Sequence, residues 1–451
     1  MKHFAIGTVV VCGLALSAVG AARTDDAIAA AFNKFWAAHN PQDASKAGEE
    51  IVASGVSFAE ALGRLQHGRT YSPDVKRGEL RLQRRSVQGD FFYDVKVPEA
   101  YDPAQKYPLR FQLHGGVMMR ESGAPMVGRS GRGDGRGGPL EGERNQIYVM
   151  PTAWRDAPWW SRAQIENLDA ILDSLKRVYN VDENRVAIAG VSDGATGLYY
   201  LAMRDTTPFA SFLPLNGSMM VLANDQLGID TNLFPTNLRN KPFFIVNGGQ
   251  DRLYPTRNVE PYIAHLDRGG VLVEYHARPE AGHNTAWWPQ IKNPFEAFVH
   301  THPRDPSPET LTWEATDRDL PSRAHWLVID KLSAASASEP PMRPDLNVFT
   351  GEGFNKGREL YARTRPSGRV DLARDGNTVR ATTRGVAQFT LLLSPTAFDL
   401  SQPVRVVLNG QTLPPSTVEP SVATLVRWSA RDNDRSMLFG AELHLSVPAT
   451  R

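Results

Sequence analysis

Through the middle of the chain, segments in which apolar residues have the spacing of a strand alternate with segments in which they have the spacing of a helix. Short apolar runs at residues 185–189 and 241–248 predict buried strands, and the amphipathic pattern of residues 163–179 predicts a helix between two strands. A strand pair is expected at residues 80–88 and 91–97. Alternating strands and helices are typical of a mostly parallel sheet with both faces covered. The pattern therefore predicts an α/β fold with flanking helices.

The two ends of the chain follow different patterns. Residues 25–66 have helical spacing, and Ser57 followed by Glu60 is a typical helix start. Beyond the proline-rich segment at residues 302–308, short alternating strands dominate, and Asn409-Gly410 is a favoured hairpin turn. The predicted organisation is a signal peptide (1–22), a helical lead segment (23–78), an α/β domain (79–302) and an all-β, sandwich-like accessory domain (310–451).

The first residues have the composition of an export signal. Lys2 and His3 precede an apolar run at residues 4–16, and the small residues 17–22 offer a cleavage site before a charged segment. We expect a secreted or periplasmic protein with no membrane span in the mature chain. The only cysteine, Cys12, lies inside the predicted signal peptide, so the mature chain would contain no disulfide.

Charge narrows the range of partners. The chain has 451 residues with 50 basic and 49 acidic side chains, a formal net charge of +1. Such a balance gives no reason to expect nucleic acid or an acidic polymer as a partner. It leaves the oligomeric state open.

Ser192 stands between a predicted strand and a predicted helix, in the segment Gly190-Val191-Ser192-Asp193-Gly194. A nucleophile elbow needs small residues on both sides of the serine, because the sharp turn strains the backbone and brings the helix close to the strand. Gly190 and Gly194 supply that room. Ser192 is therefore the candidate nucleophile, and an ordinary turn serine is the alternative.

A serine hydroxyl reacts only when a base takes its proton and an acid orients that base. Asp251 follows a predicted strand and a Gly-Gly turn, and His283 lies on a loop past the next predicted strand. Asp251 is also a candidate helix cap. The rival acid is Asp230, and the rival bases are His265 and His276.

Acyl transfer also needs an oxyanion hole, in which backbone N–H groups stabilise the charge that develops on a carbonyl oxygen. A predicted strand ends in His114-Gly115-Gly116. One N–H group is expected from Asp193, the residue after the candidate nucleophile. The other is expected from Gly115, Gly116 or Val117. His114 is expected to shape this loop.

These four motifs occur in one order, and residues 89–302 resemble the α/β-hydrolase superfamily. Within it they are similar to secreted bacterial esterases of the polyhydroxyalkanoate-depolymerase and feruloyl-esterase type. The resemblance implies Ser192 as nucleophile, Asp251 as orienting acid and His283 as general base. The chain departs from it in residues 120–144, which are unusually long and glycine-rich for the segment after His-Gly-Gly.

Tryptophans suggest where a substrate would bind. Trp159 and Trp160 follow one predicted strand, and Trp287 follows His283. Ligands of open α/β sheets bind beyond the carboxyl ends of the strands, so these rings are candidates for binding a phenolic acyl group or a sugar. Core positions are the equal alternative.

Two further patterns are weak. Residues 133–138 fit Gly-x-Gly-x-x-Gly but lack the strand–turn–helix setting of a nucleotide site. His300, His302 and Asp305 could form a metal cluster, although such a run after a helix is usually a solvated loop.

The sequence thus predicts a secreted serine hydrolase that cleaves small-molecule or polymeric carboxylic esters through an acyl-enzyme, with no cofactor. A serine peptidase of the prolyl-oligopeptidase type is the alternative enzyme. A non-catalytic carbohydrate- or polymer-binding protein on a hydrolase scaffold is the alternative class.

Overall fold

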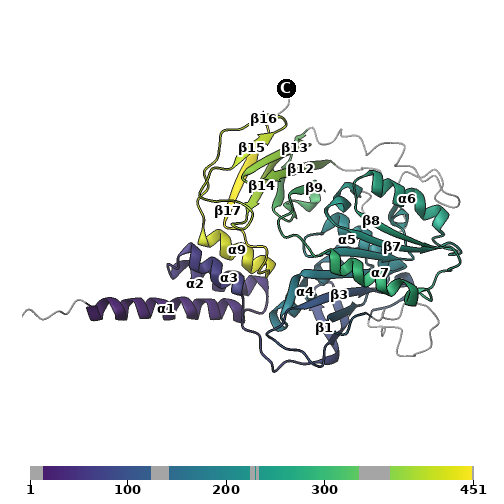
Figure 1. The fold of residues 1–451 in the computed structure, drawn as a ribbon, viewed down its shortest axis with the longest axis horizontal. Helices are drawn as coiled ribbons and strands as arrows, with labels where there is room; N and C mark the ends of the chain where they lie inside the picture. The colour runs from purple at the N-terminus through teal and green to yellow at the C-terminus, as the bar shows by residue number, and fades with distance from the viewer. Residues whose placement is uncertain (1–13, 123–141, 224–228, 230–232, 335–365, 449–451) are drawn as a thin grey trace, which may run out of the picture. The chain divides into compact units, whose positions relative to one another are not determined.

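The computed structural model describes residues 14–122, 142–223, 229, 233–334 and 366–448 (Figure 1). The chain divides into two compact units, which are described separately. One comprises residues 1–69 and 420–438, and the other comprises residues 70–419 and 439–451. Among the described residues, no helix has the length and apolar character needed to cross a membrane.

The first unit is helical. Its helices are α1 (Leu14–Ala37), α2 (Pro41–Ala53), α3 (Phe58–His67) and α9 (Val422–Asp432). The predicted helix start at Ser57 is confirmed, because its hydroxyl accepts a hydrogen bond from the N–H of Glu60. Most of the predicted signal peptide lies outside the described residues, so its cleavage stays a prediction.

A single apolar cluster joins the helices of this unit. It contains Phe32 and Phe35 of α1, Ile51 of α2, Leu65 of α3 and Leu425 of α9. The helix α9 lies within residues 310–451, for which the sequence predicts only β structure, and it supplies part of this core from far along the chain. The buried faces of the lead helices thus have their partner within the helical unit.

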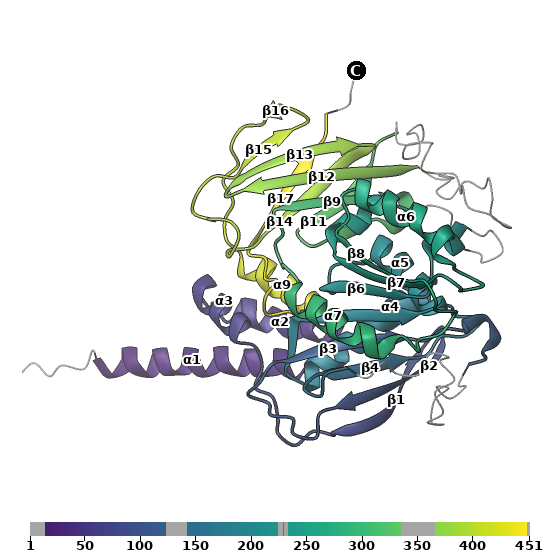
Figure 2. The same ribbon diagram turned by 45° about the vertical axis from the view of Figure 1, so that its right-hand side comes forward.

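The second unit contains a mixed sheet of eight strands, shown in Figure 2, in the order β1-β2-β4-β3-β5-β6-β7-β8. The strands β3 to β8 are parallel, and β1 and β2 join antiparallel. The bounds are β1 (Gly78–Ser86), β2 (Gly89–Val97), β3 (Tyr107–Leu113), β4 (Ile147–Pro151), β5 (Val181–Val191), β6 (Ser211–Leu215), β7 (Phe243–Gly248) and β8 (Val273–Arg278).

Helices cover both faces of this sheet. The helices α4 (Arg162–Val178), α5 (Asp193–Arg204) and α6 (Thr256–Arg268) share one apolar cluster with Ile188 and Phe212. The helix α7 (Trp288–Thr301) packs on the other face, against Ala189 and Phe244. The predicted α/β architecture with flanking helices is confirmed. Buried apolar side chains project from both faces of the central strands, and helices cover each face.

The described strands between residues 310 and 446 form two further sheets. One has the order β10-β11-β14-β17 and the other β16-β15-β13-β12-β9. The predicted hairpin at Asn409-Gly410 is confirmed, since β15 and β16 pair and both turn residues have positive φ. The bounds are β9 (Thr310–Thr316), β10 (Ser322–Ala324), β11 (Leu327–Leu332), β12 (Ser367–Asp375), β13 (Thr378–Arg384), β14 (Val386–Leu393), β15 (Arg405–Leu408), β16 (Gln411–Thr412) and β17 (Ala441–Ser446).

Two asparagines satisfy the outer edge of β9. Asn237, in the 3₁₀ helix η4 (Pro235–Asn240), accepts from the N–H of Glu314 and donates to its carbonyl, at 2.8 and 2.9 Å. Asn240 makes the same pair of bonds with Thr312, at 3.0 and 2.7 Å. Side-chain amides thus take the place of a neighbouring strand, which leaves the edge paired.

Replacement of Asn237 by alanine should destabilise the protein. Asn237 is fully buried, and its loss leaves the N–H and C=O of Glu314 without these partners. We expect about 2–4 kcal/mol less free energy of unfolding in urea titration, because buried unsatisfied polar groups cost about 1–3 kcal/mol each. Asn240→Ala, at a more exposed position, should cost less. Equal small losses for both variants would contradict the assignment.

Candidate active site

Ser192 occupies a strained turn between β5 and α5. Its φ of 56° and ψ of −117° lie outside the regions that residues with a side chain normally adopt. A Cβ atom on Gly190 would lie 2.5 Å from the backbone of Gly194, and one on Gly194 would lie 2.3 Å from the carbonyl oxygen of Leu113. The turn predicted from the sequence is therefore present, and glycine is required on both sides because backbone occupies the space.

The structure brings Ser192, Asp251 and His283 together. The Oγ atom of Ser192 lies 2.9 Å from Nε2 of His283, and Nδ1 of His283 lies 2.7 Å from Oδ2 of Asp251. Asp251 follows β7, and His283 lies on the loop between β8 and α7. Because β5, β7 and β8 are parallel, the loops after their carboxyl ends meet at one edge of the sheet.

Hydrogen bonds to Asp251 fix the tautomer of His283. The other carboxylate oxygen, Oδ1, accepts from the N–H groups of Leu253 and Tyr254, at 2.8 and 3.0 Å. Burial alone would raise the pKa of Asp251, but these bonds and the one from His283 outweigh it and hold the pKa below its usual range. A carboxylate only accepts, so Nδ1 of His283 carries the proton and Nε2 is free to accept the proton of Ser192.

The His283 loop is held by residues that sequence reasoning missed. Asn216, at a positive φ of 50° after β6, donates from its side chain to the carbonyl of Asn284 at 2.7 Å. Backbone also packs closely here, because a Cβ on Gly248 would lie 2.3 Å from the carbonyl oxygen of Ala281. The ring of Tyr254 lies 5.7 Å from that of His283. A single sequence does not show which asparagine adopts a positive φ, so Asn216 could not be identified from it.

The predicted oxyanion loop lies directly against Ser192. A Cβ on Gly115 would be 2.8 Å from the Cβ of Ser192, so glycine is needed there. The N–H of Val117 donates to the Asp193 carboxylate at 2.7 Å. Gly116 also donates a backbone hydrogen bond to this carboxylate, so the contact does not choose among the three loop residues considered from the sequence. The loop donor that acts with the N–H of Asp193 stays a prediction.

His114 anchors the other side of this loop. Its Nε2 accepts from the N–H of Ala153 at 3.0 Å, so its Nδ1 carries the proton and donates to the carbonyl of Gly115 at 2.8 Å. Burial, with a smaller contribution from Arg120, lowers the pKa of His114 to about 4. A neutral ring in this tautomer is what the loop requires.

The predicted substrate tryptophans are all buried. Trp159 and Trp160 lie in the main core, at 2% and 4% exposure. The indole N–H of Trp159 donates to the carbonyl of His114 at 2.8 Å, so Trp159 supports the oxyanion loop. Trp287 is 4% exposed. Packing therefore accounts for these rings, which is the alternative that the sequence left open.

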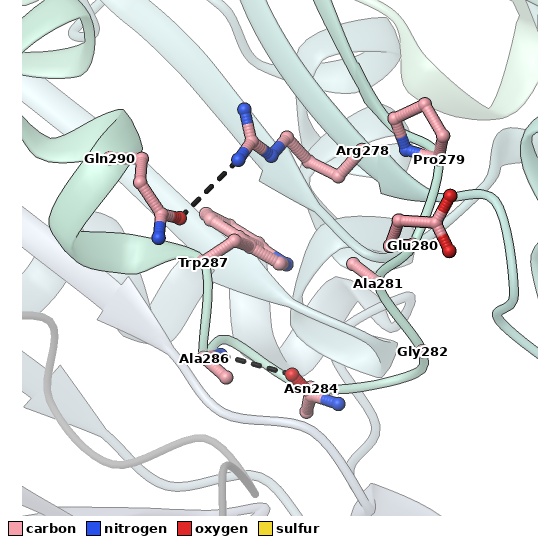
Figure 3. Close-up of a pocket in the computed structure, with 9 residues that line it drawn as sticks. All are labelled: Arg278, Pro279, Glu280, Ala281, Gly282, Asn284, Ala286, Trp287 and Gln290. Carbon is pink, nitrogen blue, oxygen red and sulfur yellow. Dashed lines mark hydrogen bonds between the residues drawn. The ribbon is translucent and has the colours of Figure 1, made fainter.

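Trp287 also lines a pocket of about 460 Å³ on the loop that carries His283 (Figure 3). Gly282 and Asn284, on either side of His283, line it too, and the guanidinium of Arg278 lies 3.3 Å from the side-chain oxygen of Gln290. Ser192 and Asp251 are not among the lining residues. The pocket is therefore adjacent to the site but separate from the reacting atoms.

The rival residues take other positions. His265 is buried in α6, and His276 lies 2.7 Å from Glu274 on β8. His300 contacts Glu143, and Nδ1 of His302 lies 2.8 Å from the carbonyl of Phe298. Within the described ranges, no group of three potential metal ligands is found. Asp230 and residues 133–138 lie outside the described residues.

No family model matches the chain, and no curated protein matches it. Similar solved structures include a thermostable esterase (18% identity, TM-score 0.37), which covers 50% of this chain and 63% of its own. Est1E from Butyrivibrio proteoclasticus is 15% identical, with a TM-score of 0.37, and the match covers 49% of this chain and 98% of Est1E. Dipeptidyl peptidase 4 from Porphyromonas gingivalis is 11% identical, with a TM-score of 0.38, covering 51% and 36%. These likenesses extend over about half of the chain.

Acid should weaken the protein through His114. The folded state binds this proton less tightly than the unfolded chain, so the stabilising contribution is complete above pH 6.5 and is lost as the pH falls toward 4. The difference between the pKa of His114 in the unfolded chain and in the folded protein corresponds to about 3 kcal/mol of unfolding free energy. We expect His114→Gln to show a smaller loss of unfolding free energy between pH 7 and pH 4 than the wild type. The buried His325, whose pKa is also lowered, is common to both proteins. Identical pH dependence would contradict this role.

Proposed function

We propose that the chain is a serine hydrolase that cleaves carboxylic esters through an acyl-enzyme, with Ser192 as nucleophile, His283 as general base and Asp251 as orienting acid. The observation that carries the proposal is the continuous hydrogen-bond chain from Ser192 Oγ through His283 to Asp251, at 2.9 and 2.7 Å. The strained turn supports it, because backbone strain persists where the surrounding structure enforces it and clusters at functional sites.

Acylation begins when Ser192 Oγ attacks the ester carbonyl carbon and its proton passes to Nε2 of His283. The carbonyl oxygen becomes an oxyanion, which the N–H of Asp193 and one N–H of the Gly115–Val117 loop stabilise. As the carbonyl re-forms, the bond to the alcohol oxygen breaks and His283 returns its proton to that oxygen. Asp251 stabilises the imidazolium while it carries the charge.

Deacylation repeats these steps with water. His283 takes a proton from a water molecule, whose oxygen attacks the acyl carbon. Collapse of the second oxyanion breaks the bond to Ser192 Oγ, which regains a proton from His283. Protons move only among Ser192, His283, water and the leaving group, so the proposed reaction uses no cofactor.

Exposed apolar side chains near the site favour esters with an apolar group. Met118 and Met119, directly after the oxyanion loop, are 41% and 85% exposed, and Leu253, two residues after Asp251, is 57% exposed. The methyl carbon of Met119 lies 3.6 Å from where a Cβ of Gly116 would be. Exposed apolar side chains that border a reacting group can bind the apolar part of a substrate. Secretion, and a domain boundary at residues 302–308, remain part of the proposal.

Turnover should depend on Asp251 and Ser192. Asp251→Asn removes the charge that stabilises the imidazolium, and we expect turnover of a soluble p-nitrophenyl ester to fall roughly 10³-fold or more. Ser192→Ala should lower turnover roughly 10⁶-fold, while its circular dichroism stays that of the wild type. Hydrolysis of aminoacyl amides without ester hydrolysis would support the peptidase instead. Absence of any hydrolysis by the wild type would support the binding protein, and normal turnover in both variants would place the catalytic residues elsewhere.

Leu253 should affect long acyl chains more than short ones. We expect Leu253→Ser to lower kcat/KM for an octanoyl ester about tenfold and for an acetyl ester by less than about twofold, since each buried methylene contributes about 0.8 kcal/mol. Leu272→Ser is the matched control, because Leu272 is similarly exposed (52%) but precedes β8 at the opposite edge of the sheet. If both variants alter chain-length preference equally, Leu253 has no specific role.

A further inference from the structure

Asp193 contributes a side chain as well as a backbone N–H at the site. It is the first residue of α5, directly after Ser192, and its carboxylate reaches across to the loop after β3. Its Oδ2 accepts a hydrogen bond from the N–H of Val117 at 2.7 Å. Val117 is the first residue of the 3₁₀ helix η1 (Val117–Met119). A short charge-assisted hydrogen bond therefore joins the nucleophile turn to the oxyanion loop.

The oxyanion loop has little means of holding itself in place. Gly115 and Gly116 have no side chains, and Gly116 adopts a left-handed conformation with φ of 69°. Glycine is the most conformationally free residue, so contacts from outside must fix these N–H groups. On the strand side His114 holds the carbonyl of Gly115. On the helix side the carboxylate of Asp193 holds the N–H of Val117.

The negative charge of Asp193 does not explain its presence. A carboxylate beside an oxyanion hole repels the charge that develops there, which opposes catalysis. Burial raises the pKa of Asp193, although bonds from Val117 and Gly116 and the nearby His283 oppose the shift. The position at the N-terminus of α5 offsets part of the cost. What this side chain offers the reaction is an acceptor for the loop.

We propose that the Asp193 side chain is a positioning residue, which holds the Gly115–Val117 loop against Ser192 so that the oxyanion N–H groups are fixed before substrate binds. The inference rests on the proposed function, because an oxyanion hole matters only if Ser192 is acylated. It predicts that the acceptor oxygen matters and the charge does not. Asparagine keeps an acceptor oxygen of the same reach, and alanine removes it.

The test compares Asp193→Asn with Asp193→Ala in the full chain, with Ser192→Ala as the reference for lost chemistry. We expect Asp193→Ala to lower kcat roughly 10–100-fold with KM changed less than about threefold, since loss of a whole oxyanion donor costs about 10²–10³. Asp193→Asn should recover at least tenfold of that loss. Hydrogen exchange of the peptide that contains residues 115–117 should be faster in the alanine variant than in the asparagine variant.

Three outcomes would overturn the positioning role. One is an alanine variant with the kcat of the wild type. A second is an asparagine variant as slow as the alanine variant, which would make the charge the decisive property. A third is a change confined to KM. Failure of the proposed function itself is distinguishable, because Ser192→Ala would then keep its activity. If the alanine variant does not fold, the asparagine variant alone tests the proposal. A kcat lowered 100-fold in that variant, with hydrogen exchange of the loop like that of the wild type, would refute it.

Discussion

The strained backbone at Ser192 is the constraint on which the rest of the site depends. A positive φ at a residue with a side chain is unfavourable, and it persists here because β5, α5 and the end of β3 meet with backbone atoms in contact. That close approach needs glycine at positions 190, 194 and 115. It presents Oγ of Ser192 above the sheet edge, and it sets the first N–H groups of α5 and the oxyanion loop around the same point. Removing any of these glycines would push the elements apart.

The parallel strands then supply the remaining chemistry from separate loops. Asp251 after β7 and His283 after β8 meet Ser192 because their strands end at the same edge, and Asn216 after β6 holds the His283 loop. The buried acid is stabilised in its charged form by two backbone N–H groups and the imidazole, so it orients His283 rather than taking its proton. Side chains also replace backbone partners at the edge of β9, where the amides of Asn237 and Asn240 take the place of a neighbouring strand.

Sequence reasoning succeeded where a feature is local. The turn at Ser192, the helix start at Ser57 and the hairpin at Asn409-Gly410 depend on neighbouring residues, and each has the predicted geometry. It failed where the partner is distant. Nothing near Val422 indicates that α9 shares a core with helices from the other end of the chain. The burial of Trp159 depends on close packing with Gly197 of α5, and the bond from Val117 to Asp193 spans β3 and β5. These contacts join residues that are far apart in the sequence and depend on the topology of the fold. They therefore cannot be predicted from the residues next to them.

Identification of the residue that becomes covalently modified tests the central claim most directly. The full chain would be treated with a fluorophosphonate, which reacts with activated serines, and the adduct would be located by mass spectrometry of proteolytic peptides. The account predicts a single adduct on Ser192, formed much more slowly in a His283→Ala variant because the proton of Oγ then has no acceptor. No adduct, or an adduct on another residue that survives Ser192→Ala, would contradict it.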